Sequence, residues 1–93
     1  MKPRQFCRLW FNVSEEDEKA RGYRKQCVKL LSRVIGLEED TIDRWGSGVD
    51  FSGMPDQYEN TLGYAMTIKR MLEEGGKNQR EIFQAVLQQL EDS

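Results

Sequence analysis

Four basic side chains recur at a strict four-residue spacing in the first third of the chain: Arg21, Lys25, Lys29 and Arg33. Residues four apart lie on the same face of an α-helix, so a helix here would carry these charges, with Arg24 beside them, on one stripe. At about 1.5 Å of rise per residue, the stripe would be roughly 18 Å long and would face several phosphates of a duplex backbone. This basic row is predicted either to bind phosphates or to be a solvated surface partly paired with the acids at positions 16–18.

Acidic side chains follow and would occupy the exposed face of the next helix. They are Glu38, Glu39, Asp40 and Asp43, beside the basic Arg44. Carboxylates repel phosphates, although a single carboxylate in a DNA groove can accept a hydrogen bond from the amino group of cytosine. Acids early in a helix also stabilise its dipole without any partner. The acids therefore argue against insertion of this helix into a groove and are better suited to a basic protein partner.

Catalytic and metal-binding chemistry has little support in the sequence. The chain has no histidine, which removes the commonest general base and the commonest metal ligand. Cys7 and Cys27 are predicted to be reduced, buried thiols, because they form no CxxC pair. The glycine-rich stretch 46–53 contains no GxxxxGK[ST] phosphate loop, and the acids near it do not have the spacing of a calcium loop. We therefore expect no enzyme activity, no metal and no cofactor.

The composition is that of one small soluble domain. The 93 residues are 38% hydrophobic and 32% charged, with a net charge of −2, which suits a single core. A cytoplasmic location without a membrane partner is expected, because no long apolar run or signal peptide is present. The charge is unevenly distributed: by residue type it is +5 over residues 1–33, −6 over 34–75 and −1 over 76–93.

The apolar periodicity predicts an all-α domain of four to five helices over residues 1–93, with no strand pattern. Residues 1–13 form an apolar N-terminal segment of helical spacing, and residues 14–74 form the central part. In the central part, a helix is predicted to start at Ser14. Gly22 interrupts the apolar pattern, so the segment up to Gly36 is predicted to be either one bent helix or two helices. A second short helix is predicted over residues 37–45, with Ile42 and Trp45 facing the core.

Residues after 45 are predicted to form a loop and two further helices. The loop covers 46–53, with Val49 and Phe51 folding back on the core. The first helix opens at Met54-Pro55 and ends at Gly75-Gly76. Residues 75–93 then form a C-terminal helix, for which Asn78 and Glu81 are a capping box. The apolar face of that helix comprises Ile82, Phe83, Val86, Leu87 and Leu90.

The spacing of residues 32–45 resembles a helix-turn-helix of the Cro/repressor type. Ser32 is followed by Gly36 four residues on, apolar Leu37, Ile42 six residues after the glycine and Trp45 three further. The resemblance covers about residues 28 to 65. It implies a DNA-binding fold in which the second helix of the motif presents its exposed side chains to the major groove.

Two functional hypotheses remain open. The leading one is a helix-turn-helix regulator of transcription that binds double-stranded DNA, with Thr41 and Arg44 touching the duplex and the basic row holding phosphates. The alternative is a protein-binding adaptor that does not read DNA. It would bind a basic partner through Glu38, Glu39, Asp40 and Asp43, with Trp10 or the last helix as an apolar anchor. The last helix either packs on its own chain or forms a homodimer contact. The dimer is an alternative because regulators of this type usually bind DNA with two copies of the DNA-binding unit.

Overall fold

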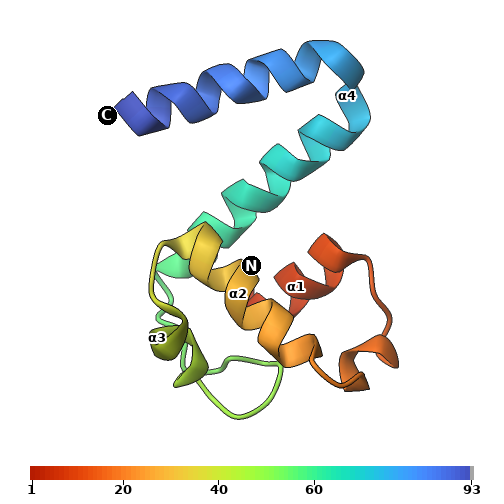
Figure 1. Ribbon diagram of the computed structural model, residues 1–93, viewed down its shortest axis with the longest axis vertical. Coiled ribbons are helices and arrows are strands. Elements are labelled where there is room, and N and C mark those ends of the chain that lie inside the picture. Colours follow the sequence, from red (N-terminus) through yellow and green to blue (C-terminus); the bar gives the residue numbers. More distant parts are fainter. Residues whose placement is uncertain (93) are drawn as a thin grey trace.

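The computed structural model describes the backbone of residues 1–92 and the side chains of residues 1–74, 84, 85, 87 and 88. Over residues 1–92 the regular structure is helical throughout, without a strand. The elements in order are α1 (Pro3–Phe11), the 3-10 helix η1 (Asp17–Lys19), α2 (Tyr23–Ile35), α3 (Glu39–Asp43) and α4 (Tyr58–Asp92) (Figure 1). The prediction of an all-α fold is confirmed.

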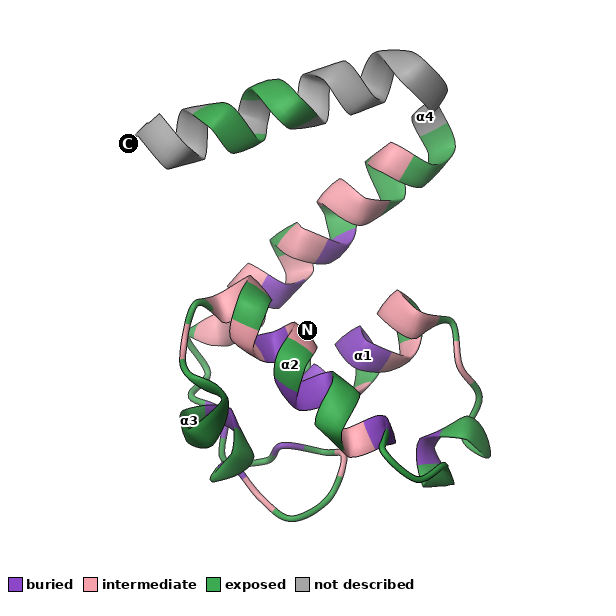
Figure 2. Ribbon diagram, in the orientation of Figure 1, coloured by how far each residue is buried: buried purple, intermediate pink, exposed green. Residues whose placement is uncertain are grey.

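One core lies between α1, α2, α3 and the first half of α4 (Figure 2). Each helix contributes the side chains of one face, and the connection between α3 and α4 adds three more. The buried apolar residues are Phe6, Cys7, Tyr23, Cys27, Val28, Leu31, Ile42, Trp45, Phe51, Met54, Leu62 and Met66. The core is thus assembled from residues spaced for helices, as amphipathic periodicity requires.

The N-terminal apolar segment is a helix that covers the core, as predicted. Pro3 stands in the first turn of α1, where its missing N–H is not needed. Phe6 and Cys7 are buried against the other helices. The helix ends at Asn12, whose left-handed backbone (φ +53°) turns the chain towards η1.

The segment 14–36 forms two elements and not one bent helix. Ser14 does serve as a cap, because the Asp17 N–H donates to its Oγ (3.4 Å) and its own N–H donates to Asp17 Oδ2 (2.9 Å). The turn that it caps leads into the short η1, whose own N-cap residue is Glu16. Gly22, with φ +88°, then separates η1 from α2. The glycine in the middle of the apolar pattern therefore marks a helix start.

The turn between α2 and α3 is at Gly36, where the sequence predicts the end of the helix. Gly36 adopts φ +86°, which a residue with a Cβ disfavours, and its N–H donates to the Ser32 carbonyl (2.9 Å). The Ser32 hydroxyl donates to the Leu37 carbonyl across the turn (2.6 Å). The Ser32 side chain therefore closes the turn by a hydrogen bond.

α3 is shorter than the predicted helix over 37–45. Ile42 is fully buried, as expected, but Trp45 lies beyond the helix end. The Trp45 carbonyl accepts a hydrogen bond from the Gly53 N–H (2.7 Å), and its ring stacks on Tyr58 with 6.0 Å between centroids. These contacts with residues later in the chain hold Trp45 in a turn, which ends α3 at Asp43.

The loop and α4 also depart from the predicted boundaries. Phe51 is buried as predicted. α4 begins at Tyr58, three residues after Pro55, because the Tyr58 N–H donates to the Pro55 carbonyl (3.1 Å) in a preceding turn. Leu62 and Met66 bury the inner face of α4 against α1 and α2.

The structure assigns a single helix to Tyr58–Asp92, where the sequence pattern placed a stop at Gly75-Gly76 and a new C-terminal helix. The predicted capping box of Asn78 and Glu81 lies outside the described side chains. So does the predicted apolar face of residues 82–90, except for Leu87, which is exposed. Among the described residues, no helix has both the length and the apolar character needed to cross a membrane.

A charged cluster joins α1 to η1 and to the loop. The Arg4 Nε and Nη2 donate to the two carboxylate oxygens of Glu18 (2.9 and 3.0 Å), and its Nη1 lies 3.3 Å from Asp50 Oδ1. Arg8 approaches Glu18 to 3.8 Å. The hydrogen bonds from Arg4 hold the pKa of the Glu18 carboxyl below its ordinary value, although burial opposes this.

Candidate nucleic-acid interface

The four residues of the basic row are exposed and have no ion-pair partner in the described part of the chain. The acids at 16–18, which were candidates to pair with them, are occupied elsewhere. Glu16 lies 3.6 Å from Lys19, and Glu18 is held by Arg4. Cations that stay exposed and unpaired in this way attract anionic groups to the surface.

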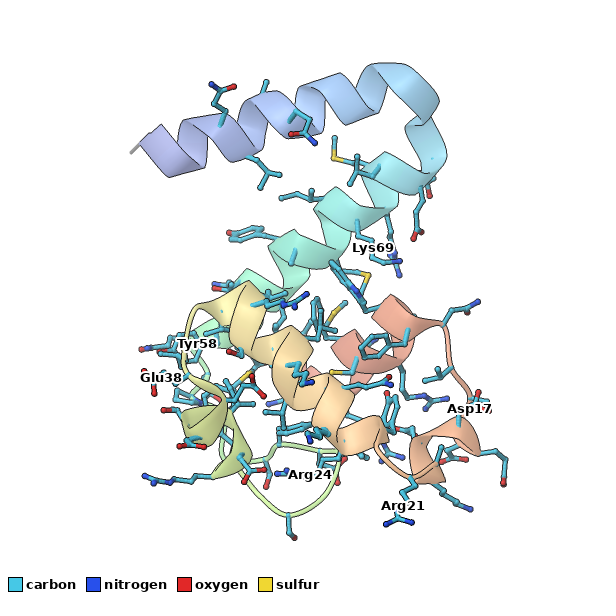
Figure 3. The ribbon with its side chains drawn as sticks, viewed as in Figure 1. Asp17, Arg21, Arg24, Glu38, Tyr58 and Lys69 are labelled. Carbon is cyan, nitrogen blue, oxygen red and sulfur yellow. The ribbon has the colours of Figure 1, made fainter. Side chains whose placement is uncertain are left out.

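The basic row begins in the turn before α2 and continues along its outer face. Arg21 precedes the helix, and Figure 3 shows its side chain directed away from the body of the molecule. Lys25, Lys29 and Arg33 follow on α2 itself. The inner face of the same helix carries Cys27 and Leu31, both fully buried. The pattern of α2 therefore separates a core face from a basic solvent face.

Arg24, beside the row in sequence, has a different role. Its guanidinium pairs with the Asp43 carboxylate and donates to the carbonyls of Asp43 (3.0 Å), Gly46 and Gly48 (3.0 Å). It also lies over the Phe51 ring, 5.1 Å from the centroid. Figure 3 shows it between α2 and the loop. Arg24 thus fixes the end of α3 and the loop, and its charge is committed within the chain.

Three of the four predicted acids form an exposed surface at the start of α3. Glu38, Glu39 and Asp40, hereafter the acidic tip, have no ion-pair partner among the described residues. The fourth, Asp43, bonds to Arg24. Asp43 thus already has a cation within the chain, and its contact with a basic partner stays a prediction.

The last two predicted DNA-contacting residues, Thr41 and Arg44, are exposed at the end of α3.

A shallow groove separates α2 from α3 and places cations and acids on its two sides. Its lining residues are Gly22, Arg24, Lys25, Val28, Glu39, Asp40 and Asp43. The structure thus brings Lys25 of the basic row to the same groove as two residues of the acidic tip.

Trp10 is half-buried and packs within the chain. Its ring lies 5.4 Å from the Phe6 ring, and the Lys69 ammonium lies 5.4 Å from its centroid. Cation–π contacts of this kind favour a fixed ring position. Trp10 therefore links α1 to α4, which leaves only part of its surface for the predicted role as an anchor.

The two cysteine thiols lie in the core, Cys7 on α1 and Cys27 on α2. Cys7 and Cys27 are buried and reduced, as predicted. The hydrogen bond with Cys27 and burial raise the pKa of Cys7, whereas the hydrogen bonds with Cys7 and Tyr23 lower the pKa of Cys27 against burial. No group of three or more metal-ligating side chains occurs among the described residues.

Sequence reasoning missed two residues that shape this surface. Both make hydrogen bonds from a side chain to backbone carbonyls: the Ser32 hydroxyl across the turn, and the Arg24 guanidinium to the loop. Ser32 carried a usable signal, since serine hydroxyls often bond to nearby backbone groups. Arg24 carried none, because its partners lie 19 to 27 residues away and any exposed arginine would look the same.

Comparison with protein-family models, with curated proteins and with solved structures gives no match for this chain.

Proposed function

We propose that this protein binds double-stranded DNA through the basic row, as a small helix-turn-helix regulator of transcription. One observation carries the proposal. The chain has a net charge of −2, yet four cations lie exposed in the turn before α2 and along its outer face, without an ion-pair partner among the described residues. Phosphate contacts supply most of the sequence-independent affinity of proteins for DNA, and such a row is suited to make them.

Two further features support the proposal. The α2–α3 unit has a left-handed glycine at its turn and a serine that closes it, in keeping with the resemblance to helix-turn-helix proteins. Arg24 also neutralises Asp43, which removes one of the four acids that would repel a phosphate backbone. Thr41 and Arg44 remain exposed in α3 and directly after it.

The test is fluorescence anisotropy of a labelled mixed-sequence duplex, titrated with protein at about 50 and 200 mM salt. The wild-type protein is expected to bind with micromolar affinity or better and to lose most of that affinity at the higher salt. The double variant Lys25→Gln, Lys29→Gln removes two phosphate contacts. It is expected to bind more weakly and to lower the slope of log K against log salt by about 2.

A matched control separates local contacts from net charge. The variant Lys2→Gln, Lys19→Gln removes the same number of charges from two exposed lysines outside the row. It is expected to keep most of the wild-type affinity. Equal weakening by both double variants would show a net-charge effect and no binding surface on α2, and absence of binding by the wild-type protein at low salt would refute the proposal.

A protein-binding adaptor is the second candidate, and the acidic tip favours it. Glu38, Glu39 and Asp40 are exposed and unpaired in the described part of the chain, so they could meet a basic partner and speed its encounter. The test is isothermal calorimetry with a lysine-rich helical peptide. Binding that disappears in the variant Glu38→Lys, Asp40→Lys would support the adaptor. Asp43 is left unchanged because Arg24 needs it.

A further inference from the structure

α3 presents mainly carboxylates to any ligand that approaches it. The helix has five residues, Glu39–Asp43, and all of them except Ile42 are exposed. A helix that reads bases directs hydrogen-bonding side chains at the base edges, most often as arginine on guanine or an amide on adenine. Here Thr41 is the one exposed position within α3 that is not a carboxylate.

The basic row turns away from α3 as it runs along α2. Lys25 borders the groove between the two helices, and Val28 lies on the α3 side of it. Each residue advances about 100° around a helix, so residues four apart are displaced by about 40°. That displacement carries Lys29 and then Arg33 around the helix away from Val28, which lies on the α3 side. Arg21 and Glu38 lie towards opposite sides of the view in Figure 3.

Resting on the DNA binding proposed above, we propose that α2 is the element that contacts the duplex and that it contacts phosphates alone. In this arrangement the acidic tip is repelled by the phosphates and keeps α3 out of the groove. Binding is then independent of base sequence, because phosphate contacts set position but carry no sequence information. A regulator of this kind would act by occupying DNA and not by choosing an operator.

The surface around α2 also favours a duplex over a single strand. Proteins that bind single strands stack the bases on exposed aromatic side chains. Among the described residues the exposed aromatic is Tyr64, which lies on α4, while Tyr23 of α2 and Trp45 after α3 are buried. The basic row therefore offers charge without a stacking platform, which suits a regular backbone with paired bases.

The experiment compares three labelled duplexes of about 20 base pairs and unrelated sequence, plus one single strand, at about 50 mM salt. The wild-type protein is expected to bind the three duplexes within about twofold of one another, and the single strand more weakly. Arg44→Lys keeps the charge but removes the ability to form a bidentate contact with guanine. Because α3 makes no base contact in this proposal, the variant is expected to change no affinity by more than about twofold.

Neutralising the acids tests the repulsion directly. The variant Glu39→Gln, Asp40→Asn is expected to bind every duplex at least about threefold more tightly. The matched control Asp56→Asn, Glu74→Gln changes net charge equally at exposed positions outside α3, and it is expected to gain less. Equal gains in the two variants, or no gain in the first, would overturn the role assigned to the acidic tip.

The remaining outcomes distinguish failure of this inference from failure of the proposed DNA binding. Discrimination between the duplexes of about tenfold or more that is lost in Arg44→Lys would show groove reading by α3. That result would overturn this inference and leave DNA binding intact. Tighter binding of the single strand would overturn the duplex assignment. If the wild-type protein bound none of the probes, DNA binding itself would be refuted.

Discussion

At the scale of single residues, Arg24 shows how one side chain can hold a whole surface in place. Its guanidinium reaches the Asp43 carboxylate and three backbone carbonyls while lying over Phe51. An arginine suits this position because its planar group donates in several directions at once and also stacks on a ring. Phe51 itself has a positive φ of +48°, so the loop conformation depends on such support.

Replacement of Arg24 by alanine should therefore destabilise the protein. We expect a loss of about 2 kcal/mol in the free energy of unfolding, because hydrogen bonds from a charged group and a cation–π contact disappear together. Urea unfolding followed by circular dichroism measures it. Arg33→Ala, on the exposed face of the same helix, is the control and should change stability by less than about 0.5 kcal/mol. Similar losses in the two variants would show that Arg24 supports nothing beyond α2.

At the scale of elements, the loop between α3 and α4 is held by a close backbone approach. The Gly53 N–H donates to the Trp45 carbonyl at 2.7 Å. A Cβ built on Gly53 would lie 3.0 Å from both the Cα and the carbonyl oxygen of Trp45. Backbone atoms cannot move aside as a flexible side chain can, so this crossing requires glycine. The crossing also explains why α3 stops where it does.

Gly53→Ala should accordingly cost about 2 kcal/mol of stability, the range typical of overpacking at a rigid contact. Gly48→Ala is the matched control in the same loop, because a Cβ there meets nothing within 4 Å. It should be neutral to within about 0.5 kcal/mol. Thermal unfolding of the two variants side by side measures the difference, and a neutral Gly53→Ala would mean that the loop can take another path.

At the scale of the whole molecule, charge is used in two separate ways. The Arg4–Glu18–Asp50 cluster joins three distant segments and is structural. The basic row and the acidic tip are exposed and unpaired among the described residues, so they cost little to keep and are available to ligands. The net charge of −2 conceals this division. Net charge alone therefore says little about which surface meets a partner.

The pH dependence of stability should report the Glu18 cluster. The ordinary pKa of a glutamate is 4.5, and that of Glu18 is lower in the folded protein. The unfolded chain then binds more protons in acid, so the stabilisation is full above the ordinary pKa and is lost as the pH falls through the folded one. Glu18→Gln should flatten the fall in unfolding free energy between about pH 6 and pH 3. Glu39→Gln, which removes a carboxylate from an exposed and unpaired site, is the control.

The helical fold and much of the core followed from the sequence because their signals are local. Periodic apolar positions brought Phe6, Leu31, Ile42 and Leu62 into the core, and Gly36 ended α2 at the predicted position. Such features depend on the chain within a few residues, where spacing determines which side chains share a face. Boundaries were less accurate at Ser14, Trp45 and Pro55, where contacts with other segments decide whether a turn extends into a helix.

Only the tertiary structure decided which charges remain available for binding. Arg24 and Lys25 are adjacent and chemically similar, yet one is bound to Asp43 and the loop while the other is exposed. Glu18 is buried against Arg4, whereas Glu16, two residues earlier, is exposed. An ion pair forms when folding brings two groups within a few ångströms, and separation in sequence does not determine that distance. The sequence therefore determined that cations and acids occupy successive helical segments, and the packing of those segments decided which of them can meet a partner.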